Sequence, residues 1–85
     1  MIQRPRFTAH LHAEVVKGEG VFLISQIGYS VLNGRLFELV APFIDGRRSV
    51  DEIVENLRDQ ASTAEVYYAL MLLEQKGYLR ESDYA

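Results

Sequence analysis

The spacing of apolar residues divides the chain into a first half that predicts strands and a second half that predicts helices. Apolar and polar side chains alternate over residues 7–16, which is typical of a half-buried β-strand. The continuous apolar run at residues 21–25 predicts a central strand, and residues 29–32 predict a short third strand at the sheet edge. Residues 4–6 are expected to form a flexible lead-in. The first half therefore predicts a three-stranded antiparallel sheet.

Two helical segments are predicted next. Residues 35–44 place apolar side chains at helical spacing, and Pro42 is expected to kink or end that helix. Ser49 stands three residues before Glu52, which is the capping-box sequence that begins a helix. A second helix is therefore expected to start directly after Ser49.

The third predicted helix covers residues 63–76. Ser62 and Glu65 form a second capping box, and Gly77 provides a left-handed stop after the last turn. At about 100° per residue, one apolar stripe is expected to face the core: Val66, Ala69, Leu70 and Leu73. Four further apolar residues lie on the flanks and back of the helix, where a surface helix is normally polar: Tyr67, Tyr68, Met71 and Leu72. Either the rest of the chain or an outside partner must cover them.

The order of the elements predicts the fold class. Three strands, three helices and a strand-like end at residues 78–80 predict an α+β fold that is winged helix-turn-helix-like, a three-stranded antiparallel sheet followed by three helices. A chain of 85 residues is large enough for one hydrophobic core. We therefore expect a single domain over residues 1–85, with its ordered core over residues 7–80.

Composition and charge narrow the classes of function. The chain has no cysteine, so a disulfide framework and a thiolate metal site are both excluded, and a cytoplasmic location is expected. No stretch approaches the ~20 apolar residues of a membrane span. The net charge of −3 argues against attraction to nucleic acid or to anionic lipid.

Few residues suggest catalysis or metal binding. His10 and His12 would share one face of the first predicted strand, with Glu14 as the nearest carboxylate on that face, but two histidines do not make a metal site. Ser49 and Ser62 are interpreted as helix caps, and no serine is placed for a catalytic triad. The sequence therefore predicts no catalytic residue, no metal and no cofactor.

A winged helix commonly reads DNA with its third helix. Here that helix carries Glu65 and Glu74 against Lys76 alone, and it offers tyrosine, methionine and leucine where base-reading helices offer arginine, asparagine and glutamine. The pair Arg47 and Arg48 is interpreted as a solvated turn. DNA binding stays as the alternative function.

A peptide is the better predicted ligand. An edge strand presents unpaired N–H and C=O groups, and the third strand has no lysine or proline to block pairing. A peptide could pair with the strand while packing on the last helix, which predicts the following binding residues: Tyr29, Ser30, Val31, Leu32, Tyr67, Tyr68 and Met71. Two alternatives stay open, namely that the helix residues complete the core, and that the edge pairs with a second copy in a homodimer.

Three stretches of the chain also resemble a known family. Residues 20–25, 36–48 and 64–79 are similar to the PqqD-like precursor-recognition domain, the recognition element for ribosomally synthesised and post-translationally modified peptides. The resemblance is closer to the N-terminal leader-peptide-binding domain of cyclodehydratases that make thiazole- and oxazole-modified peptides. It covers the chain from about Phe7 to Arg80.

The resemblance implies a non-catalytic domain that binds a leader peptide. In such domains the leader adds antiparallel to the third strand and packs against the third helix, which here are residues 29–32 and 63–76. The family also implies a YcaO-type or ThiF-like modifying enzyme as partner, often fused after the domain. The chain is thus expected to be an excised N-terminal piece of such a protein.

Overall fold

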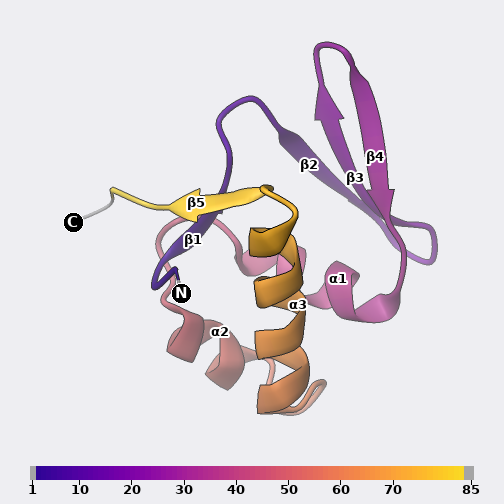
Figure 1. The fold of residues 1–85 in the computed structure, drawn as a ribbon. Coiled ribbons are helices and arrows are strands. Elements are labelled where there is room, and N and C mark those ends of the chain that lie inside the picture. The colour runs from indigo at the N-terminus through magenta and orange to yellow at the C-terminus, as the bar shows by residue number, and fades with distance from the viewer. Residues whose placement is uncertain (1, 84–85) are drawn as a thin grey trace.

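The computed structural model describes residues 2–83 and confirms a three-stranded antiparallel sheet followed by three helices (Figure 1). In chain order, the elements are β1 (Pro5–Phe7), β2 (His12–Val16), β3 (Gly20–Ser25), β4 (Gly28–Leu32), α1 (Arg35–Val40), the 3₁₀ turn η1 (Ala41–Phe43), α2 (Val50–Asn56), α3 (Thr63–Gln75) and β5 (Leu79–Glu81). Residues 1, 84 and 85 of the expected domain lie outside the described residues.

The main sheet has the strand order β2-β3-β4, so β3 is the central strand as predicted. Val21 and Leu23 on β3 are almost completely buried, whereas Ile24, on the opposite face, is 41% exposed. Because side chains alternate between the two faces of a strand, this sheet has one face on the core and one face open to solvent. On that open face Phe22 is partly buried, so the outer side of β3 is covered only in part.

The predicted single strand over residues 7–16 is wrong, because the chain turns in the middle of it. The N–H of Leu11 donates to the carbonyl of Thr8 at 3.0 Å, and this turn separates β1 from β2. β1 pairs with β5 at the far end of the chain, with Arg6 opposite Arg80. The predicted flexible lead-in is also wrong, since Pro5 belongs to β1 and is nearly fully buried.

The helix boundaries follow the predicted signals. The Ser49 and Ser62 hydroxyls each accept the backbone N–H of the glutamate three residues later at 3.1 Å, and each glutamate carboxylate accepts the serine N–H in return. α1 ends at Val40, two residues before Pro42, and the chain continues as η1. Gly77, with φ of 79°, follows the end of α3. Both capping boxes and both helix stops are confirmed.

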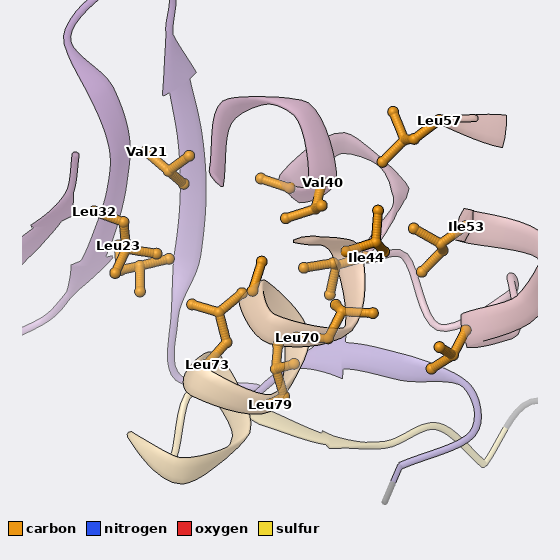
Figure 2. Close-up of a cluster of buried hydrophobic side chains, with 14 residues drawn as sticks. Val21, Leu23, Leu32, Val40, Ile44, Ile53, Leu57, Leu70, Leu73 and Leu79 are labelled. Atoms are coloured by element: carbon orange, nitrogen blue, oxygen red, sulfur yellow. The ribbon is translucent and has the colours of Figure 1, made fainter. Parts of the chain in front are cut away.

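The core lies between the inner face of the sheet and the three helices (Figure 2). The predicted stripe of α3 is its centre, because all four of its members are buried: Val66, Ala69, Leu70 and Leu73. Val21 and Leu23 from β3, Val40 from α1, and Ile53 and Leu57 from α2 complete it. Within residues 2–83, no helix has the length and apolar character needed to cross a bilayer.

Candidate functional site

The strand β4 lies at the edge of the main sheet. It pairs with β3 on one side, and among residues 2–83 no strand pairs with its other side. Its sequence, Gly-Tyr-Ser-Val-Leu, contains no charge and no proline. Edge strands are normally protected by such residues against pairing with other chains. The predicted edge is therefore present and chemically open to an added strand.

The register shows which backbone groups an added strand would meet. β3 and β4 are joined by a tight turn, so that Ser25 is opposite Gly28 and Leu23 is opposite Ser30. In an antiparallel pair, hydrogen-bonded and non-hydrogen-bonded positions alternate, and the residues flanking a two-residue turn are bonded to each other. We therefore expect Ser30 to direct its backbone groups to β3, and Tyr29 and Val31 to direct theirs outward.

The side chains of β4 divide between the two faces of the sheet. Leu32 is opposite Val21 and is buried on the core face, which Ser30 shares. Tyr29 is 69% exposed on the outer face, where its ring centroid lies 5.9 Å from that of Phe22. Val31, opposite Phe22, belongs to the same outer face. Of the four predicted strand residues, Tyr29 and Val31 therefore place their side chains on the outer face of the sheet, and Ser30 and Leu32 place theirs on the core face.

The four surplus apolar residues of α3 differ in how far their side chains are exposed. Tyr68 and Met71 are 56% and 50% exposed, whereas Tyr67 and Leu72 are half-buried. The hydroxyl of Tyr67 donates to Oδ1 of Asp51 on α2 at 3.2 Å, and this bond raises the pKa of Tyr67. Tyr67 therefore lies on the flank of α3 that meets α2.

The opposite flank of α3 faces the side on which β4 passes into α1. At about 100° per residue, Tyr68 and Leu72 lie about 40° from each other, and Leu72 lies about 140° from Tyr67. Glu65 lies on this same flank, and the charge of Arg35 at the start of α1 contributes to lowering its pKa, after the hydrogen bonds from Ser62. In Figure 1, α2 and α1 lie on opposite sides of α3. Of the predicted helix residues, Tyr68 therefore lies on the exposed part of α3 that is nearer to α1 than to α2.

Leu72 is a residue that the predicted binding set omits. The sequence places Leu72 among the surplus apolar residues of α3, but the flank of the helix that it occupies depends on where α1 and α2 pack. The helical angle between Tyr68 and Leu72 was already available in the sequence and could have grouped them.

A hollow of about 810 Å³ opens next to the end of β4. It is lined by the β2–β3 turn with Lys17, by the link from β4 into α1 with Asn33, Arg35 and Glu38, and by Gln60 between α2 and α3. None of the seven predicted binding residues lines it. The N–H of Gly18 donates to Glu38 at 3.0 Å across one side of the hollow, which ties the turn to α1.

The histidines are not arranged as the sequence predicts. His10 lies in the turn between β1 and β2, while His12 lies on β2, so they do not share one strand face. Nε2 of His12 lies 3.0 Å from Oε1 of Glu14 on the exposed surface. Among residues 2–83, no group of three or more histidine, aspartate or glutamate side chains could hold a metal ion.

The arginine pair lies in the turn before α2, next to Asp45. Oδ1 of Asp45 accepts the N–H groups of Arg47 and Arg48, and Oδ2 lies 2.6 Å from the guanidinium of Arg48. Partial burial raises the pKa of Asp45, but these hydrogen bonds and the charge of Arg48 outweigh it, so that the pKa is lowered. The turn beside Asp45 is as predicted.

The sheet and the three helices define a small winged-helix domain in which, among the described residues, β2 and β4 are both edge strands and β4 is the uncharged one. Residues 6–81 match the winged helix-turn-helix domain family, and the chain belongs to that family. No curated protein matches the chain.

The chain is similar to short parts of two much longer solved proteins. The chain is similar to part of the heterocyclase TruD, with 30% identity and a TM-score of 0.85 over 91% of this chain and 11% of that one. It is equally similar to part of a heterocyclase in complex with substrate and cofactor, with 30% identity and a TM-score of 0.83 over 91% of this chain and 10% of that one. The chain thus spans about a tenth of the length of these solved heterocyclases.

Proposed function

We propose that this chain is a non-catalytic recognition domain that binds the leader segment of a ribosomally made precursor peptide. The leader adds as an antiparallel strand along β4 and rests side chains on the flank of α3 that carries Tyr68. By holding the leader, the domain raises the concentration of the modifiable part of the precursor at a heterocyclase-type enzyme, of the YcaO or ThiF-like kind.

The observation that carries this proposal is the uncharged edge of β4. Alternate residues of β4 are hydrogen-bonded to β3. The backbone N–H and C=O groups of the residues between them, Tyr29 and Val31, are therefore expected to point outward, where an added strand can pair with them. Strand addition uses those groups for affinity and uses neighbouring side-chain surfaces for selectivity. Similarity to heterocyclases, one of them in complex with its substrate, supports a peptide as the added strand.

The predicted binding residues have different parts in this proposal. Tyr29 and Val31 supply the outward backbone, while Ser30 and Leu32 line the core-side face against which the leader side chains would turn. Tyr68 and Leu72 form the surface of α3 that would contact the leader, and Met71 lies beside that surface on the exposed back of the helix. Tyr67, held by Asp51 on the other flank, is expected to contribute least.

DNA binding fits the winged-helix family but not the charges of this chain. Between residues 50 and 76, which cover α2 and α3, there are six acidic and two basic side chains. A duplex is held mainly through its phosphates by basic side chains. The charges of α2 and α3 therefore disfavour binding of a duplex by the third helix.

The test is a titration of the ¹⁵N-labelled chain with a synthetic copy of the leader encoded in the precursor gene beside the chain's own gene. We expect the amide resonances of β4 and of the Tyr68 flank of α3 to shift and to saturate. A twelve-base-pair duplex is the comparison ligand. Shifts confined to the His12 or Arg47 regions, or saturation by the duplex in place of the leader, would contradict the proposal.

A further inference from the structure

The ribbon formed by β1 and β5 brings two arginines face to face. Arg6 and Arg80 are direct cross-strand partners, so their side chains leave the same face of the ribbon at neighbouring positions. Within residues 2–83, neither guanidinium forms an ion pair with a carboxylate. Like charges directly opposite each other destabilise a strand pair.

Two acidic residues next to the ribbon, Asp45 and Glu81, have carboxylates that are committed to other partners. Asp45 forms an isolated bridge with Arg6 through its backbone, but its carboxylate is held by Arg47 and Arg48. Glu81 directly follows Arg80, yet its carboxylate accepts the backbone N–H groups of residues 3 and 4 at 2.9 and 2.8 Å. The positive charge of the two opposed arginines is therefore left for an outside group.

Thr8 supplies an independent observation on the Arg6 side of this pair, at a hollow that Arg80 does not line. It lies two residues after Arg6, and both residues line a hollow of about 340 Å³ at the β1–β2 turn, together with His12 and Asp45. The hydroxyl oxygen of Thr8 is buried and has no hydrogen-bond partner among the described residues. A buried hydroxyl without a partner costs stability. The hydroxyl is a free donor next to a cationic side chain.

We propose that Arg6, Thr8 and Arg80, named here the ribbon site, bind a carboxylate side chain of an acidic protein segment. A guanidinium presents two parallel N–H donors that match a carboxylate, and a hydroxyl adds a third donor. A hollow of about 340 Å³ suits one side chain and not the continuous backbone of a duplex.

The ribbon site is separate from the proposed leader edge. Arg6 and Arg80 lie on the ribbon that pairs β1 with β5, whereas β4 belongs to the other sheet. The chain matches about a tenth of the length of two solved heterocyclases. In the proposed function, on which this step rests, a domain that delivers a peptide must also be held against the surface of another protein. The ribbon site would supply that second contact.

The test uses the 85-residue chain and two capped synthetic peptides, hexaglutamate and hexaglutamine, at low ionic strength. We expect hexaglutamate to shift the side-chain Nε–H resonances of Arg6 and Arg80 and the amide of Thr8, while hexaglutamine does not. The double variant R6Q/R80Q should lose at least about tenfold in affinity. The matched control K17Q/R58Q removes the same charge elsewhere and should stay within about twofold.

A second variant separates the ribbon site from general charge. Thr8→Val removes the buried hydroxyl and keeps the shape of the side chain, so it should weaken hexaglutamate binding while Tm stays equal or rises. The proposal is overturned if K17Q/R58Q loses as much affinity as R6Q/R80Q, if Thr8→Val lowers Tm, or if a twelve-base-pair duplex shifts the same resonances more strongly than hexaglutamate. Leader binding at β4 should be unchanged in R6Q/R80Q, so the two proposals fail independently.

Discussion

The hydroxyl of Tyr67 reaches Oδ1 of Asp51 across 3.2 Å and fixes that tyrosine against α2. The hydroxyl of Tyr68, the next residue, forms no hydrogen bond with any residue of the described range 2–83, and Tyr68 is 56% exposed. A single step of about 100° along the helix therefore separates a half-buried tyrosine that is held by α2 from a tyrosine of the open surface. The two aromatic residues, which look equivalent in the sequence, should behave differently when they are changed.

Tyr68→Ala is expected to weaken leader binding by about tenfold, which corresponds to about 1.4 kcal/mol. Its effect on the free energy of unfolding should be small, because more than half of the side chain is already in water. Tyr67→Ala should have the reverse profile, with a clear loss of stability and little loss of affinity. Isothermal titration calorimetry and chemical denaturation of both variants measure the two quantities. Equal losses of affinity in both variants would remove Tyr68 from the proposed site.

Val31→Pro tests strand addition directly. Proline removes one backbone N–H, and at position 31 that group is expected to point away from β3. Leader affinity should therefore fall by at least about tenfold while the domain stays folded. Ser30→Pro is the matched control, because position 30 should direct its N–H to β3, so that this variant loses stability first. If Val31→Pro unfolds the domain as readily as Ser30→Pro, the assignment of the outward positions is wrong.

The features that could be predicted are those that depend on neighbours in the sequence. The Ser49 and Ser62 capping boxes and the core stripe around Leu70 each depend on spacings of three or four residues, and each is confirmed. The edge position of β4 followed from the order of three short strands joined by tight turns. The predictions that failed concern features that depend on partners far away in the sequence, or on turns that contain none of the residues typical of turns.

The break between β1 and β2 is the clearest example. The turn from Thr8 to Leu11 has no glycine, proline or asparagine, so nothing interrupts the alternating pattern. β1 leaves the main sheet because its partner, β5, lies at the other end of the chain. The different positions of Tyr67 and Tyr68 have the same origin, since only the packing of α2 against α3 decides which tyrosine is held.

Gly20 should be far less tolerant of substitution than Gly18, although both have positive φ. A Cβ at Gly20 would lie 2.6 Å from the backbone oxygen of Leu32, so alanine would push β4 away from β3. A Cβ at Gly18 would meet nothing within 4 Å. We expect Gly18→Ala to cost about 1 kcal/mol from backbone strain alone, and Gly20→Ala to cost at least twice that. Urea denaturation of the two variants gives the comparison, and equal costs would contradict the close approach of Leu32 to Gly20.

Acid should weaken the fold through Glu81. Its carboxylate accepts the N–H groups of Gln3 and Arg4, and these bonds hold the pKa of Glu81 below its ordinary value of 4.5. Because the folded pKa is the lower one, the carboxylate stabilises the fold above the unfolded pKa, and that contribution is lost as the pH falls through the folded pKa. Glu81→Gln should therefore lower Tm at pH 7 and reduce the drop in Tm between about pH 7 and pH 3.

The control for this titration is Asp83→Asn, two residues away and exposed. It removes the same charge without touching the bonds to Gln3 and Arg4, so its Tm at pH 7 should match that of the unchanged chain. Glu52 and Glu65, whose pKa values are lowered by the hydrogen bonds of their capping boxes, continue to titrate in both variants. Part of the acid sensitivity should therefore survive in Glu81→Gln. An acid profile of Glu81→Gln that is superimposable on that of the unchanged chain would show that Glu81 does not anchor the N-terminal segment.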